Sequence, residues 1–254
     1  MGASVRLVGG PTVVLEYGGL RWLTDPTFSA PGEHAGGLVK TSGPAVAAAD
    51  LGAIDVALVS HDHHADNLDP TGRELLGDIP RVFTTGAGAA RLGGDVAGLD
   101  PWETVALTGL GGERVAVTAL PALHGPPGSE DVTGPVIGFL LAGDGLQTVY
   151  VSGDNASLDV VREIAERAGD IDVAILFAGA VQLARRFDGA YLTLSSDRAA
   201  EATRILRAPV AIPVHFEGWA HFTQGADALR AAFHGNGVAD RLRLLAPGET
   251  CVTP

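Results

Sequence analysis

The sequence of 254 residues predicts one α/β domain, because short strands fill its first part and helices alternate with strands in its last third. In the first sixty residues, apolar runs are separated by the turn signals Gly9-Gly10-Pro11 and Gly18-Gly19. From residue 157 on, apolar residues at helical spacing alternate with continuous apolar runs. No linker-like stretch divides the chain, so we expect a single domain over residues 1–254.

Each expected strand is a short apolar run bounded by turn residues, and each expected helix shows apolar residues three or four positions apart. In chain order, the expected strands are 5–8, 12–17, 20–23, 54–59, 81–84, 104–107, 114–119, 136–141, 148–151, 172–177, 209–214 and 241–245. The expected helices are 70–76, 86–92, 157–167, 196–206 and 224–234. Residues 27–50 lack periodicity, and we expect a long loop there with at most one short helix.

Composition limits the class of protein. Hydrophobic residues make up 46% and charged residues 19%, which is typical of a folded globular chain. The formal charge of −13 repels phosphate backbones, so we expect no nucleic-acid partner. No signal-peptide pattern and no apolar run of roughly 18 residues are found, so we expect a cytoplasmic protein with no membrane partner. A homo-oligomer is compatible with the sequence, which does not indicate one.

The cysteine count restricts the kind of metal site. Cys251 is the only cysteine, so an internal disulfide and an all-cysteine zinc site are both excluded. Any metal must therefore be bound by histidine and carboxylate side chains. Such ligands suit Zn²⁺, with Mn²⁺ or Fe²⁺ as alternatives.

The stretch 60–69 contains three histidines and three aspartates directly after an apolar run. The pair Asp69-Pro70 marks a helix start, with Asp at the N-cap and Pro at the first helical position. The cluster therefore lies on a short loop between a strand and a helix. Side chains on such a loop can converge on one metal ion.

The same pattern, an apolar strand followed at once by a potential ligand, recurs along the chain. It is found at Asp25, in the His61–Asp66 cluster, and at His124, Asp154 and His215. Repeated placement at strand ends predicts that these residues share one edge of the fold and form one site.

These motifs, in this order, resemble those of the metallo-β-lactamase superfamily. The chain is most similar to the branch with ascorbate-phosphate lactonase-like and N-acyl-phosphatidylethanolamine phospholipase-like hydrolases. The resemblance implies an αββα sandwich, in which two mixed β-sheets are flanked by helices, with one or two metal ions at one edge.

The superfamily's HxHxDH motif fits the cluster in two registers. One register uses His61 and His63, but it places Ala65 where the motif has its aspartate. The other uses His64 and Asp66 and places Asn67 where the motif has its last histidine. We favour the second register because it keeps the carboxylate. His61, His64 and Asp66 are then the expected ligands, and His63 is the alternate.

The resemblance implies roles for the remaining residues. His124 would complete the first metal position, Asp154 would bridge two ions, and His215 would bind the second. Asp25 would orient a ligand histidine. We expect Asp66 and Asp154 to orient the catalytic water and His221 to act as a proton donor.

The sequence thus predicts a metal-dependent hydrolase that acts on a small-molecule ester, lactone or phosphodiester through a metal-activated water. Arg185-Arg186 is a candidate for binding an anionic group. The alternative is a metal-binding sensor or assembly protein of the same fold without hydrolytic activity, which the Asn67 substitution keeps open.

Overall fold

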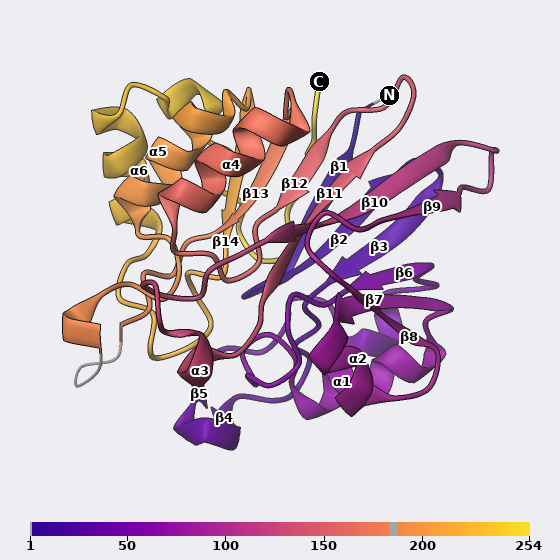
Figure 1. Cartoon of the computed structure of the whole chain (residues 1–254). Coiled ribbons are helices and arrows are strands. Elements are labelled where there is room, and N and C mark those ends of the chain that lie inside the picture. Colours follow the sequence, from indigo (N-terminus) through magenta and orange to yellow (C-terminus); the bar gives the residue numbers. More distant parts are fainter. Residues whose placement is uncertain (1, 183–186) are drawn as a thin grey trace.

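Two β-sheets face each other at the centre of the computed structural model, which describes residues 2–182 and 187–254 (Figure 1). The first sheet has the order β15 (Thr250–Val252), β1 (Ser4–Gly9), β2 (Thr12–Tyr17), β3 (Leu20–Thr24), β6 (Val56–Leu58), β7 (Arg81–Thr85) and β8 (Val96–Leu99). The second has the order β14 (Val210–Val214), β13 (Val173–Phe177), β12 (Val149–Val151), β11 (Ile137–Ala142), β10 (Arg114–Pro121) and β9 (Thr104–Thr108).

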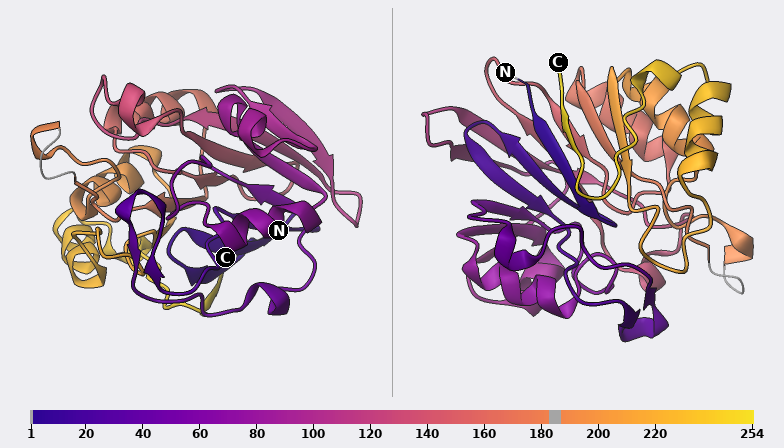
Figure 2. Two further views of the ribbon diagram at one scale, coloured as in Figure 1. Left: turned by 90° about the horizontal axis from the view of Figure 1, so that it is seen from below. Right: turned by 180° about the vertical axis from the view of Figure 1, so that it is seen from behind.

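Helices cover the outer faces of both sheets (Figures 1 and 2). On the second sheet lie α4 (Leu158–Ala168), α5 (Ser196–Leu206) and α6 (Ala226–Gly235), and beside the first lie α1 (Pro70–Leu75) and α2 (Gly86–Leu92). Buried side chains between the sheets, such as Trp22 and Phe139, form the central core. A second apolar cluster joins the second sheet to α4–α6, with Val161 and Ile164 as the buried residues of α4. The predicted αββα sandwich is therefore confirmed.

Both sheets mix parallel and antiparallel pairs. In the first, β3, β6, β7 and β8 pair in parallel. In the second, β12, β13 and β14 do so. The carboxyl ends of these parallel strands carry the loops that hold most of the candidate site residues, whereas His124 follows β10, which pairs antiparallel with β9 and β11.

One predicted strand is wrong. Residues 241–245 are not a strand: Ala239–Arg241 is a 3₁₀ turn, and Leu242 makes only an isolated bridge to Ala211. The apolar character of this run reflects side-chain packing without strand pairing: Leu242 and Leu244 contact the second apolar cluster, and Leu245 is buried in the central core. The last strand is β15, which lies at the edge of the first sheet and pairs with β1.

Short elements escape the sequence analysis. They are β8, the helix α3 (Glu130–Thr133), and a small hairpin of β4 (Gly32–Glu33) and β5 (Val39–Lys40) inside the expected long loop. The hairpin and α3 both lie at the end of the molecule that is at the bottom of Figure 1. Among the described residues, no helix is long and apolar enough to cross a bilayer.

Candidate metal centre

Loops from both sheets meet at one edge of the sandwich. Asp25 follows β3 and the His61–Asp66 loop follows β6, so these come from the first sheet. His124, Asp154 and His215 follow β10, β12 and β14 of the second sheet. The structure thus brings together the strand-end residues that the sequence singled out.

Four side chains form the tightest group. His61, His64, His124 and Asp154 each offer one ligand atom, and these atoms lie within 4.8 Å of one another. Nε2 of His61 is 2.9 Å from Nδ1 of His64, and Nε2 of His124 is 3.6 Å from Oδ2 of Asp154. Three imidazoles and one carboxylate match the ligand number and type of a tetrahedral divalent ion.

A second group adjoins the first through Asp154. Nε2 of His215 lies 3.4 Å from Oδ1 of Asp154 and 3.5 Å from Oδ2 of Asp66. The same Asp66 oxygen is 2.9 Å from Nε2 of His221. Asp154 therefore faces both groups, one with each carboxylate oxygen. A carboxylate that bridges two metal ions needs this position.

His63 lies outside both groups. Its Nε2 is 2.7 Å from the carbonyl oxygen of Thr133, although its ring is beside that of His61 with centroids 4.8 Å apart. A Cβ on Gly134 would approach Nε2 of His63 to 2.6 Å, so the glycine makes room for this ring. This contact with α3 leaves His64, and not His63, aimed at the cluster.

Burial keeps the histidines of the first group neutral. It lowers the pKa of His61 well below its usual value, and the neighbouring His64 and His124 lower it further. Burial, followed by the nearby His124, lowers the pKa of His64 to about 4. The pKa of His124 is also lowered, chiefly by burial. Neutral imidazoles keep a free lone pair, which metal binding needs.

The two aspartates respond differently to burial. Burial raises the pKa of Asp154 to about 7; the nearby His215 acts to lower it, and the negative charges of Asp66 and Asp25 act to raise it. Burial also raises the pKa of Asp66, but His215 and His221 outweigh this and hold it well below its usual value. A nearby cation would stabilise the charged form of Asp154, which burial disfavours.

Buried polar atoms without hydrogen-bond partners test whether these residues fit a metal. Oδ1 of Asp154 and both ring nitrogens of His215 are such atoms, and the His215 side chain is 0% exposed. Leaving these groups unsatisfied costs free energy in a folded protein. A divalent ion among them would satisfy the Asp154 oxygen and one ring nitrogen, so the residues fit a metal.

The backbone supports this geometry at two strained positions. Asp25 has φ 31° and His215 has φ 56°, in the left-handed region that non-glycine residues seldom adopt. Gly153 has φ 55°, and a Cβ there would approach the Ile137 carbonyl oxygen to 2.6 Å. This glycine lets the loop that carries Asp154 pass close to β11.

Hydrogen bonds orient the ligand side chains. Nδ1 of His124 is 2.7 Å from the Leu192 carbonyl oxygen, so its Nε2 faces Asp154. Asp25 accepts hydrogen bonds from the amide and the hydroxyl of Ser60, and each bond is 2.6 Å long. Asp25 is thus connected to His61 through Ser60, whose Oγ is 3.0 Å from Nδ1 of His61.

Further ion pairs hold the loop in place. Asp62 is buried and accepts hydrogen bonds from Arg91, while Arg73 lies 3.6 Å away. Asp69 caps α1 by accepting a hydrogen bond from the Gly72 amide at 2.8 Å, as predicted. The partners Arg91 and Leu192 could not be predicted from the sequence, because they are distant in the chain and no motif marks them.

A pocket of ≈ 500 Å³ opens over the cluster. It is lined by His64, Asp66, His124, Asp154 and His221, together with His63, Thr133 and Gln182 and the apolar residues Ala35, Gly36, Leu38, Val132, Val181 and Leu192.

The pair Arg185-Arg186 lies outside the described residues, so its suggested role in anion binding is untested.

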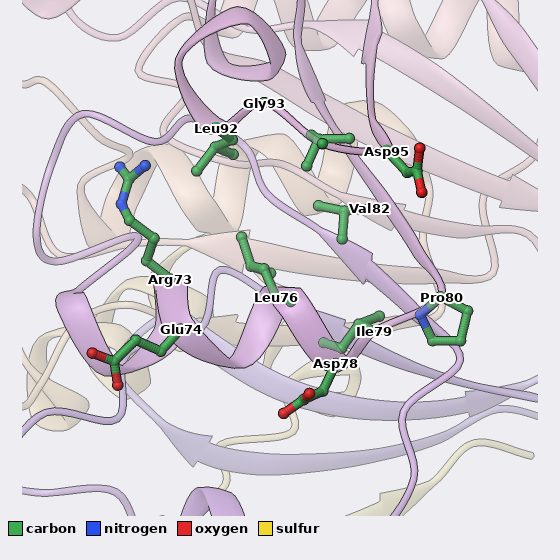
Figure 3. A pocket seen from close by; sticks show the side chains of 13 residues that line it. Arg73, Glu74, Leu76, Asp78, Ile79, Pro80, Val82, Leu92, Gly93 and Asp95 are labelled. Carbon is green, nitrogen blue, oxygen red and sulfur yellow. The ribbon is translucent and has the colours of Figure 1, made fainter.

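Another cavity, of ≈ 550 Å³, lies between α1 and the segment that joins α2 to β8 (Figure 3). Aliphatic side chains such as Leu76 and Val82 line it beside charged ones such as Arg73 and Asp95. None of its described lining residues is a histidine, and it does not reach the cluster. The chemistry of the chain is therefore expected at the first pocket.

The fold and the His/Asp cluster together define a class of protein: the chain belongs to the beta-lactamase superfamily, whose domain model matches residues 21–216. Within it, the chain belongs to the UPF0173 metal-dependent hydrolases. Such a protein from Methanosphaerula palustris is 30% identical over 185 residues, which cover 70% of this chain and 75% of that protein. Another, from Anaeromyxobacter dehalogenans, is 26% identical over 246 residues, covering 93% and 81%.

A solved structure confirms the fold. A possible metal-dependent hydrolase from Veillonella parvula matches with a TM-score of 0.82 at 17% identity and covers 99% of both chains. The predictions of the fold class and of a metal-dependent hydrolase are thus confirmed. The metal, the substrate and the residue roles stay predictions.

Proposed function

We propose that this metal-dependent hydrolase cleaves a small, uncharged carboxylic ester or lactone in the pocket over the His/Asp cluster. One observation carries the proposal: the pocket sets that cluster against an apolar wall that includes Leu38, Val132 and Leu192. Among its described lining residues there is no lysine or arginine to bind a phosphate. The chain's charge of −13 also disfavours an anionic substrate. A phosphodiester is therefore the weaker candidate.

The proposed ligands of the first ion are His61, His64, His124 and Asp154. When bound, a divalent ion supplies Lewis acidity, which polarises a carbonyl group and lowers the pKa of water. Three imidazoles and a carboxylate favour Zn²⁺, with Mn²⁺ or Fe²⁺ as alternatives.

The chain's own groups would position the reactants. Asp66 and Asp154 both line the pocket and are proposed to orient the attacking water. The apolar wall would hold the substrate's hydrocarbon part and exclude bulk water, which strengthens electrostatic interactions at the reacting carbonyl. The buried histidines stay neutral and so add no charge that would compete with a cation.

Metal content and hydrolysis measured on the same preparations test the proposal. We expect the purified protein to contain a transition metal and to hydrolyse 4-nitrophenyl butyrate or a γ-lactone faster than bis(4-nitrophenyl) phosphate. His124→Ala should lose metal and turnover together, and the exposed control His234→Ala should lose neither. Full metal retention with lost turnover in His124→Ala would contradict the ligand assignment.

The alternative function has its own outcome in the same assay. A wild-type protein that is fully loaded with metal but inactive on every ester, lactone and phosphodiester offered would favour the non-hydrolytic sensor or assembly role.

A further inference from the structure

Asn67 occupies the position at which the HxHxDH motif has its last histidine, and it is committed elsewhere. The side chain is fully buried, and its Nδ2 donates a hydrogen bond to Oδ2 of Asp25 over 3.1 Å. An amide is also a poor ligand for a transition metal compared with imidazole. Asp66, Asp154 and His215 would therefore leave a second ion one protein ligand short of a set of four.

His221 lies where that missing ligand is needed. Its Nε2 is 2.9 Å from Oδ2 of Asp66, the oxygen that Nε2 of His215 approaches to 3.5 Å. The His221 side chain is only 20% exposed, and its other nitrogen, Nδ1, is buried without a hydrogen-bond partner. The fully buried His215, whose nitrogens also lack partners, faces the same oxygen. The Nε2 atoms of His215 and His221 thus converge on the Asp66 carboxylate from two points of the chain.

The backbone holds His221 in this place. Its neighbour Ala220 donates a hydrogen bond to the Val39 carbonyl in β5 over 2.9 Å. On the other side, Thr223 donates one to the Gly179 carbonyl over 3.0 Å. The His221 ring packs against Phe222, with centroids 4.6 Å apart. Bonds on both sides fix the residue without the substrate, as a metal ligand requires.

We propose that His221 replaces the motif histidine lost at Asn67 and completes a second divalent-metal position with Asp66, Asp154 and His215. The donor set is then two imidazoles and two carboxylates, with Asp154 shared between the two positions. This inference rests on the metal centre of the proposed function, and it assigns His221 a ligand role in place of the proton donor expected from the sequence.

Cobalt titration of the chelator-treated protein tests this inference without an activity assay. Wild type should bind two equivalents of Co²⁺, seen in the visible absorption spectrum and by elemental analysis. His221→Ala should bind one, with its affinity for the second lowered at least about 10-fold. The retained first equivalent shows that the variant is folded. His221→Asn provides a second variant of smaller volume change, and His234→Ala is the control, which should keep both equivalents.

Two outcomes would overturn the inference: a wild type that binds a single equivalent, or a His221→Ala protein that binds both with unchanged affinity. Loss of turnover in His221→Ala with both equivalents retained would instead assign the residue to proton transfer. If wild type binds two ions and His221→Ala one, but no substrate is cleaved, the proposed function fails and the second metal position stands.

Discussion

The hydroxyl of Ser60 donates a hydrogen bond to Asp25 over 2.6 Å, and the same oxygen lies 3.0 Å from Nδ1 of His61. Because the Ser60 proton is directed at Asp25, Nδ1 of His61 must carry its hydrogen and donate it to Ser60. The lone pair of His61 is then on Nε2, the atom that faces His64. Asp25 thus sets the tautomer of a proposed ligand through one serine.

Ser60→Ala should therefore weaken metal binding without abolishing it. The variant frees the His61 ring to take the wrong tautomer, and we expect affinity for Zn²⁺ to fall about 10- to 100-fold. Competition with a coloured chelator measures the change. The exposed Ser42→Ala is the matched control, and equal affinities for both variants would contradict the orienting role of Ser60.

The two registers of the histidine motif make opposite predictions. His64→Ala should lose the first metal ion, because Nδ1 of His64 faces Nε2 of His61. His63→Ala should keep it, because His63 is bonded to the Thr133 carbonyl and not to the cluster. Elemental analysis of the two purified variants decides between them. The reverse result would place His63 in the site.

How much of the site is predictable depends on the range of the contacts that build it. Strand ends are local features, so apolar runs followed by Asp25, His124, Asp154 and His215 are enough to predict a shared edge. The choice between His63 and His64 is not local, because it depends on a contact with a carbonyl in α3, 70 positions along the chain. Spacing alone leaves both registers open.

The fold shows the same division. The helices and most strands follow from periodicity, but the edge strand β15 pairs with β1 at the opposite end of the chain. An exposed three-residue edge strand has no apolar run to mark it, whereas in the segment 241–245 Leu242 and Leu244 pack against the second apolar cluster and Leu245 packs in the central core. An apolar run marks burial and not strand pairing, so it falsely marks residues 241–245 and misses the exposed β15.

The ion pair of Lys40 with Asp69 should be important for stability. Both side chains are nearly inaccessible, and Nζ lies 3.0 Å from Oδ2 of Asp69 and 2.9 Å from the Thr27 carbonyl. Lys40→Met would leave the Asp69 charge buried without its cation, which costs about 3–5 kcal/mol. Urea unfolding measures this loss. Arg230→Met, which breaks an exposed pair with Asp227, should cost less than about 1 kcal/mol.

Tyr17 links the two sheets, and its ionisation should make stability depend on pH. Its hydroxyl donates a hydrogen bond to the Gln147 carbonyl over 2.6 Å. Burial, aided by the charge of Asp172, raises its pKa above the ordinary value of 10.0. The folded state therefore holds this proton more tightly than the unfolded state. Stability from this group is complete below about pH 10 and is lost as the pH rises further, when the unfolded phenol ionises.

Tyr17→Phe removes both the hydrogen bond and the ionisation. Near neutral pH we expect wild type to be more stable by about 1 kcal/mol. Above about pH 10 this difference should shrink, because the Tyr17 phenol then ionises in unfolded wild type but stays protonated in the folded protein. Ionisation lowers the free energy of unfolding of wild type and does not affect Tyr17→Phe. Tyr150, whose pKa burial also raises, is present in both proteins and cancels in the comparison. Urea unfolding of the metal-free proteins at about pH 8 and about pH 10.5 measures the difference, and an unchanged difference would mean that Tyr17 ionises equally in both states.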